Sequence, residues 1–260
     1  MDIKNYLDEQ AKRINHPSFI INDPVQFPRR YKRLQDIEIV SFLVAAITWG
    51  RRPMILRNAE RMLSGMGNSP YDYVMNGDYE NLGTANVHRT FFEQNMAYLL
   101  RGFGHFYNLY NSMDEYMSSC TPKNPQKLVE ILRETAWIAN RKREDGKCYP
   151  SNLKNTALKR VNLALRWLVR NDGIVDLGVW KSITPDQLYI PLDVHVGNTA
   201  RKIGLLTRKS NDWKAVEELT GRLREYNPED PVLYDFALFG IGIEQSSAAN
   251  GRGSKPITFN

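Results

Sequence analysis

Residues 191–205 read PLDVHVGNTARKIGL, a proline-led stretch with an acid and a histidine near its start. The proline suits the first turn of a helix, where its missing N–H would have no partner anyway. Asp193 follows two residues later, where the helix dipole favours a negative charge. Apolar residues then recur at helical spacing at Val196, Ala200 and Ile203. The pattern predicts a half-buried helix headed by Asp193, and on spacing alone this acid could simply be a helix cap.

The run Leu192-Asp193-Val194-His195, followed by a basic pair and a Gly-Leu end, resembles a segment of known enzymes. It is similar to the catalytic-aspartate segment of the helix-hairpin-helix DNA glycosylases, a superfamily that includes endonuclease III and the 8-oxoguanine DNA glycosylases. The 8-oxoguanine branch carries the same Asp-Val-His run after a proline. The resemblance implies that Asp193 lies at the mouth of a base pocket and that His195 lies near a DNA phosphate.

Composition is compatible with this interpretation without requiring it. The chain has 260 residues with 42% hydrophobic and 25% charged side chains, which is ordinary for a globular protein. Its formal net charge is +6, so an acidic partner fits. Two cysteines are too few for a disulfide scaffold or for the four-cysteine cluster of endonuclease III. We expect a cytoplasmic, nucleoid-associated monomer with no membrane span, no metal and no cofactor.

Helical periodicity runs through most of the chain, and strand patterns are almost absent. It predicts about ten helices and no sheet, among them 1–15, 37–49, 91–110, 125–141 and 213–223. The fold class is therefore all-α. By analogy with the glycosylases, we expect two helical subdomains with the active site in the cleft between them. Residues 37–190 would form a central helical barrel with a degenerate hairpin element, and residues 1–36 plus 191–260 would form the second subdomain.

The turn from Trp49 to Arg52 joins an aromatic, a glycine and two arginines after the first strongly apolar helix. In the glycosylases, the corresponding turn carries residues that fill the hole left by an extruded base. The resemblance therefore implies DNA contacts from Trp49, Arg51 and Arg52. The alternative is that Trp49 packs in the core while the two arginines are simply solvated.

Lys159 heads a predicted helix and is followed seven positions later by Arg166. This spacing is similar to that of the nucleophilic lysine in the small archaeal-type 8-oxoguanine glycosylases, although the glycine-rich hairpin that normally precedes it is missing. Arg160 is adjacent and is expected to lower the pKa of the Lys159 amine. Asp193 lies 34 residues after Lys159, about double the usual separation, so residues 172–183 look like an insertion. Lys181, within that insertion, is the rival nucleophile.

Residues 230–242 resemble the last helix of the 8-oxoguanine glycosylases. The match implies that Phe239 stacks on the flipped base and that Asp235, one turn earlier, binds the base edge. A carboxylate accepts from two adjacent donors at once, and guanine offers N1–H beside its 2-amino group. In the alternative interpretation, Phe239 is a core residue and Asp235 only complements the helix dipole.

The resemblance implies a base-excision DNA glycosylase with AP-lyase activity. It would act on double-stranded DNA and remove an oxidised purine such as 8-oxoguanine by base flipping. Asp193 and Lys159 would be catalytic, and Asp235 and Phe239 would bind the base. The residues expected to contact DNA are His195, Trp49, Arg51, Arg52, Arg160 and Arg166.

Other functions remain open at this point. The chain could be a non-catalytic DNA-binding protein of the same fold, a glycosylase for another damaged base, or a helical protein-interaction module. The whole chain also resembles a bacterial family of unassigned function.

Overall fold

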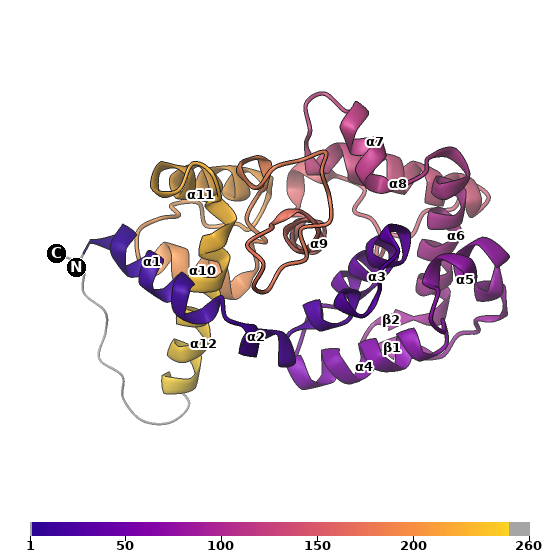
Figure 1. Ribbon diagram of the computed structural model, residues 1–260, viewed down its shortest axis with the longest axis horizontal. Helices are drawn as coiled ribbons and strands as arrows, with labels where there is room; N and C mark the ends of the chain where they lie inside the picture. Colours follow the sequence, from indigo (N-terminus) through magenta and orange to yellow (C-terminus); the bar gives the residue numbers. More distant parts are fainter. Residues whose placement is uncertain (1, 250–260) are drawn as a thin grey trace.

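The computed structural model describes residues 2–249, with side chains described for residues 2–242. Residues 1 and 250–260 of the predicted second subdomain lie outside the described residues. Twelve α-helices dominate the described chain (Figure 1). The helices are α1 (Ile3–Ile14), α2 (Pro17–Ile21), α3 (Leu34–Ala46), α4 (Arg52–Ser64), α5 (Pro70–Asn76), α6 (Glu93–Leu109), α7 (Met113–Ser119), α8 (Pro125–Ala139), α9 (Lys159–Val169), α10 (Val194–Lys202), α11 (Trp213–Tyr226) and α12 (Tyr234–Ala249). Short 3-10 turns are η1 (Pro24–Gln26), η2 (Pro28–Arg30), η3 (Asp78–Asn81), η4 (Leu153–Asn155), η5 (Pro185–Gln187) and η6 (Pro231–Leu233).

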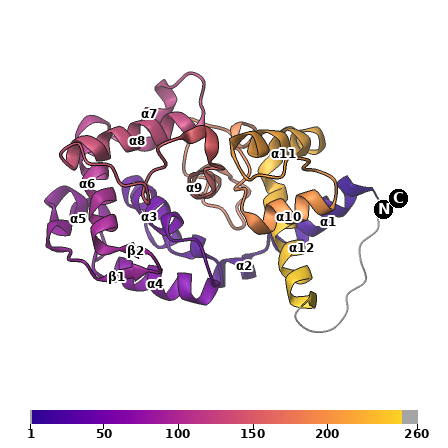
Figure 2. The same ribbon diagram turned by 180° about the vertical axis from the view of Figure 1, so that it is seen from behind.

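The helices form two groups in both views of the molecule (Figures 1 and 2). Helices α3 to α8 lie together at one end, while α1, α10, α11 and α12 lie together at the other, with α9 between the two groups. Within the groups, α6 packs on α8, and α12 packs on both α1 and α10. Helix α9 packs against α3 and forms an ion pair with α12 through Arg166 and Asp235, so it joins the two groups.

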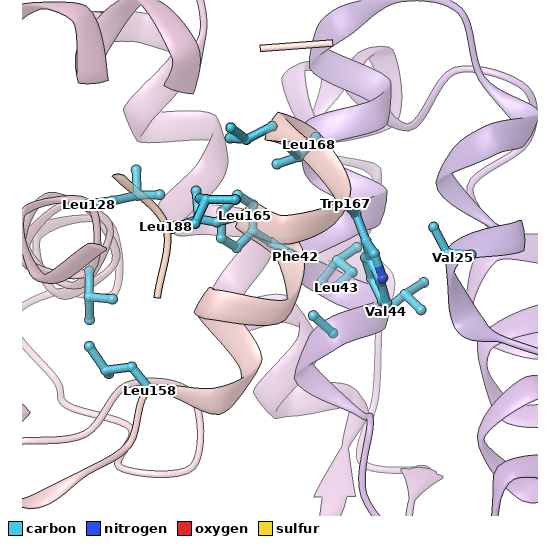
Figure 3. Close-up of a cluster of buried hydrophobic side chains, with 14 of the residues drawn as sticks. Val25, Phe42, Leu43, Val44, Leu128, Leu158, Leu165, Trp167, Leu168 and Leu188 are labelled. Atoms are coloured by element: carbon cyan, nitrogen blue, oxygen red, sulfur yellow. The ribbon is translucent and has the colours of Figure 1, made fainter. Parts of the chain in front are cut away.

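Helix α3 forms the centre of the core because it is apolar nearly all the way round. Its side chains meet those of α9, with Phe42 and Leu43 from α3 close to Leu165 and Trp167 from α9 (Figure 3). Trp167 and Leu43 are fully buried. Burying a side chain of this size stabilises the fold by about 1.5–3 kcal/mol. The two helices that carry the site are therefore fixed to each other through the core.

Helix α12 packs closely against α1 and α10 because two glycines lie at the points of contact. A Cβ placed on Gly240 would lie 2.8 Å from Cγ1 of Ile14 in α1. A Cβ placed on Gly242 would lie 2.9 Å from the Oγ1 of Thr199 in α10. Only glycine allows such an approach. This packing sets the position of Asp235 and Phe239, which α12 carries.

The segment between α9 and α10, which the sequence marked as an insertion, packs directly against α9. The N–H of Leu177 donates to the carbonyl of Trp167 at 2.7 Å, and the N–H of Trp180 donates to that of Leu168 at 2.9 Å. The carboxylate of Asp176 is fully buried between the guanidinium groups of Arg166 and Arg170. The segment is thus part of the core rather than a loop added to the surface.

Two local predictions differ from the structure. Helix α10 begins at Val194 rather than at Pro191, because Asp193 is its N-cap and accepts from the N–H of Val196 at 2.9 Å. The prediction of no sheet is also wrong: β1 (Asn86–His88) and β2 (Phe91–Phe92) pair antiparallel. These strands are too short to produce a recognisable alternation. Within the described residues, no helix is both long and apolar enough to cross a membrane.

Candidate functional site

A cavity of about 990 Å³ opens where the turn after α3 meets the starts of α9, α10 and α12. Volumes of this size are typical of ligand sites. Its wall is largely apolar and aromatic, with charged side chains reaching in from segments far apart in the sequence. The charged residues among its lining are Asp23, Arg52, Lys147, Lys159, Arg160, Arg166, Asp193 and Asp235.

Lys159 is the first residue of α9, and its amine faces the carboxyl end of α3. The Nζ atom donates to the carbonyl oxygen of Thr48 at 2.7 Å, and the side chain remains 27% exposed. Burial lowers the pKa of this amine, the Asp193 carboxylate acts in the opposite direction, and Arg160 lowers the pKa further, in the direction expected from the sequence. A partly dehydrated amine in a cavity is poised to lose its proton.

The residue before Lys159 has an unusual backbone. Leu158 has a φ of 48°, in the left-handed region that large apolar residues rarely adopt. Its side chain is buried in the core, which holds the residue in this conformation. The chain therefore turns sharply into α9, and Lys159 stands at the head of the helix.

Asp193 lies beside this amine. Its Oδ2 atom is 3.7 Å from the Nζ of Lys159, while its Oδ1 atom caps α10 by accepting from the N–H of Val196. The helix cap and the site are therefore not alternatives, since each uses a different oxygen. The Asp193 side chain is 24% exposed, so its free oxygen can reach a ligand in the cavity.

The turn after α3 is fixed by a buried histidine. His88 donates from Nε2 to the carbonyl of Trp49 at 2.7 Å, and its Nδ1 contacts the Nδ2 of Asn58 at 2.9 Å. The imidazole also lies edge-on to the Trp49 ring, with centroids 4.8 Å apart. The Arg160 guanidinium lies 4.5 Å from the centre of the same Trp49 ring. These contacts hold Trp49 in the cavity wall. This position fits a packed side chain better than one that is free to enter the DNA duplex.

The two arginines of this turn have different positions. Arg51 is exposed and does not line the cavity. Arg52 lines it, forms an ion pair with Asp23 at 3.3 Å, and lies 4.6 Å from the centre of the Phe239 ring. Phe19 packs edge-on against the same ring at 6.3 Å. The face of Phe239 is therefore covered by a guanidinium group, which is itself a planar stacking surface.

Asp235 lies at the floor of the cavity beside Arg166. The guanidinium donates from one nitrogen to Oδ2 of Asp235 and contacts Oδ1 of Asp176 at 3.3 Å. Within the described residues, no other group donates to the Asp235 carboxylate. Burial raises the pKa of Asp235 to about 6, and Arg166 limits the rise.

Three other predicted residues are placed as follows. The Arg166 side chain is only 4% exposed and is neutralised by two carboxylates, so the expected DNA contact is corrected to a structural role behind Asp235. His195 is exposed at the rim of the cavity. Lys181 is exposed and outside the cavity lining, and its N–H donates to Asp114 at 2.9 Å. The geometry therefore separates the rival nucleophile from Asp193.

Sequence reasoning missed several residues of this site. His88 is brought to the turn by the unpredicted hairpin, and Asn58 contacts it from α4. Phe19 lies in the short helix α2 and Asp23 just after it, in a stretch of sequence without periodicity. No local pattern identifies them. Among the described residues, no group of three or more histidine, cysteine, aspartate or glutamate side chains is arranged to hold a metal ion.

Comparison with known proteins identifies a family. The model of a family described as a protein of unknown function, DUF2400, matches residues 23–244. The matched region contains all the described charged residues that line the cavity. No curated protein and no solved structure matches the chain.

Proposed function

We propose that this chain, which belongs to the DUF2400 family, is a DNA glycosylase with AP-lyase activity that removes an oxidised purine. The observation that carries the proposal is the pair formed by Lys159 and Asp193. An amine with a lowered pKa and a partly exposed carboxylate meet 3.7 Å apart inside a large cavity. Two groups of this kind are what covalent cleavage of an N-glycosidic bond needs.

The reaction would proceed as follows. The neutral Lys159 amine attacks C1′ of an extruded nucleotide, and the bond from C1′ to the base breaks. The base leaves with the bonding electron pair and takes up a proton. Asp193 stabilises the positive charge that develops on the sugar, and it accepts the proton that the attacking amine releases. Opening of the sugar ring then gives a Schiff base between Nζ and C1′, with a proton passing to the ring oxygen.

Strand cleavage follows from that Schiff base. Loss of a proton from C2′ allows the bond to the 3′ phosphate to break, and the phosphate leaves with the electron pair. Water then hydrolyses the Schiff base and frees Lys159. A base inside a duplex cannot reach this amine, so the nucleotide must enter the cavity by base flipping. The cavity volume of about 990 Å³ leaves ample room for a purine nucleotide.

The preference for a guanine-type base over other bases rests on Asp235. Its Oδ2 atom is paired with Arg166, while Oδ1 has no donor among the described residues, and the residue lines the cavity. A carboxylate in this place accepts from N1–H and the 2-amino group of guanine. Adenine and the pyrimidines do not offer that pair of donors.

The test is borohydride trapping on duplexes that contain 8-oxoguanine. We expect a covalent adduct with the wild-type protein and none with Lys159→Gln. The matched control is Lys181→Gln, which removes an exposed lysine outside the cavity and should leave trapping unchanged. Trapping that survives in Lys159→Gln and disappears in Lys181→Gln would assign the nucleophile to the segment between α9 and α10.

One contact favours a second candidate, a DNA-binding protein without base excision. Arg52 lies over the Phe239 ring, where an extruded base is expected to stack. If Arg52 stays there, the base must stack on the guanidinium group or remain in the duplex. Duplex binding without any trapped adduct, at every lesion tested, would favour this candidate.

A further inference from the structure

Four cations lie beside the part of the cavity wall that the β1–β2 hairpin and the turn after α3 form, where Gly50 and Thr90 line the cavity. They come from four separate segments of the chain and belong to none of the predicted motifs as a group. We call them the hairpin-side cations: Arg51, Arg89, Lys147 and Arg160.

A chain of short contacts links these segments. A Cβ placed on Gly50, next to Arg51, would lie 2.8 Å from the guanidinium of Arg89. The Lys147 amine donates to the carbonyl of Thr90 at 2.9 Å, and the Arg160 guanidinium donates to the carbonyl of Lys147 at 3.1 Å. The four cations therefore share one surface beside the cavity.

These cations are not neutralised within the protein. Some exposed arginines elsewhere do pair with acids, as Arg30 does with Glu60 and Arg33 with Asp72. Among the described residues, none of the hairpin-side cations forms an ion pair with a carboxylate. The carboxylate of Asp145, two residues before Lys147, instead accepts from the Lys147 N–H and the Asn95 amide. An uncompensated positive surface attracts an anionic partner.

The hairpin tip adds a second, independent observation. Arg89 and Thr90 form a two-residue turn between β1 and β2, and Arg89 has a φ of 51°. A positive φ at this place in a hairpin normally selects glycine or asparagine. A bulky, exposed arginine is not the residue that the backbone prefers here. Backbone strain of this kind at an exposed tip indicates that the charge of the Arg89 side chain has a functional role.

We propose that the hairpin-side cations bind the phosphates of the DNA strand next to the extruded nucleotide. The proposal rests on the proposed function, and it extends the expected DNA contact from the turn after α3 to the hairpin and to Lys147. A nucleotide that leaves the duplex must have its flanking phosphates held in register with the pocket. Three of the four side chains belong to segments other than α9 and α10, which carry Lys159 and Asp193. The surface can therefore bind the DNA strand without displacing these two residues.

The test uses Arg89→Gly. Glycine accepts the positive φ better than arginine, so this variant removes the charge without straining the hairpin, and its Tm should equal or exceed that of the wild type. Binding to a fluorescein-labelled undamaged duplex is measured by anisotropy over a range of NaCl concentrations. Each lost phosphate contact should reduce the slope of log K against log salt by about 0.9. Arg89→Lys should keep the wild-type slope.

The matched control is Arg222→Gln, which changes the net charge equally on α11, far from the hairpin in the views shown (Figures 1 and 2). We expect its slope to equal that of the wild type. An unchanged slope in Arg89→Gly would overturn the inference, and intact borohydride trapping in that same variant would leave the proposed function standing. A wild-type protein that neither binds duplex DNA nor forms an adduct would reject both.

Discussion

The amine nitrogen of Lys159 lies 3.7 Å from Oδ2 of Asp193, although 34 residues separate the two in the chain. The intervening segment makes this possible because it folds back along α9, where Leu177 and Trp180 donate to carbonyls of the helix. The chain thus returns to the head of α9 just as α10 begins. The long segment between the two residues packs against α9, so their separation in the chain does not prevent their contact.

Asp193→Asn should abolish base release while leaving DNA affinity within a few-fold of the wild type. The substitution removes the charge that stabilises the sugar cation, but asparagine is as good an N-cap as aspartate, so α10 should keep its start. Single-turnover excision and duplex binding measure the two effects separately. Undiminished excision by this variant would refute the glycosylase assignment.

Asp193→Ala serves as the comparison. Alanine removes the cap as well as the charge, and loss of an N-cap costs about 1 kcal/mol of stability. The free energy of unfolding should therefore fall in Asp193→Ala and stay near the wild-type value in Asp193→Asn. Equal stability of the two variants would show that the bond to the Val196 N–H contributes nothing.

The pH dependence of trapping reports on Lys159. Burial lowers the pKa of its amine, so the reactive neutral form should appear at a lower pH than for an exposed lysine. The rate of adduct formation should rise with pH and level off below about 10.4, the ordinary lysine value. Arg160→Gln should move this plateau to higher pH, because a neighbouring positive charge is removed. A plateau at the same pH in both proteins would exclude Arg160 from this effect.

The residue patterns, together with the resemblance to the helix-hairpin-helix DNA glycosylases, predicted part of this structure. The apolar run of α3 predicted a buried helix, and the resemblance pointed to Lys159 and Asp193, which do meet. The hairpin could not be predicted, since each of its strands is too short to show alternation. The placement of Arg166 could not be predicted either. Its burial depends on pairing with Asp235 and with Asp176, which lies in the segment that looked like an insertion.

Asp176→Ala should destabilise the fold severely. Its carboxylate is fully buried and contacts the guanidinium groups of Arg166 and Arg170. Arg166 would keep Asp235, and Arg170 would keep Asp172 and Asp230, but each guanidinium would lose its one fully buried carboxylate partner. Removing one partner of a buried ion pair costs about 3–5 kcal/mol. Urea denaturation measures the change. The comparison is Glu60→Ala, which breaks an exposed pair with Arg30 and should cost no more than about 1 kcal/mol. Similar losses in the two variants would contradict a structural role for the buried cluster.

Phe239→Ala should weaken excision of all bases alike. An aromatic face does not read the base edge, and losing a stacking contact costs about 1–3 kcal/mol per base. The measurement is single-turnover excision on duplexes that carry 8-oxoguanine and, separately, an oxidised pyrimidine. Because Arg52 lies over this ring, the variant also removes one contact of its guanidinium group, which keeps the ion pair with Asp23. A loss confined to one of the two lesions would mean that Phe239 does more than stack.

The assignment of a guanine-type substrate depends on Asp235. Unlike Phe239→Ala, a substitution of Asp235 should affect excision of one lesion far more than that of the other. If its carboxylate accepts from N1–H and the 2-amino group, Asp235→Ala should lower kcat/KM for 8-oxoguanine on the order of 100-fold or more, because each charge-assisted bond contributes about 1.5–3 kcal/mol. The oxidised pyrimidine should be affected far less.

A pH profile tests the same carboxylate without any substitution. Its pKa is raised to about 6, so the ionised acceptor is present above that pH and is protonated below it. Wild-type selectivity for 8-oxoguanine should therefore decline as the pH falls through about 6, and the profile of Asp235→Ala should lack this step. A wild type that prefers the pyrimidine, or a variant that keeps the purine preference, would reduce Asp235 to a structural partner of Arg166.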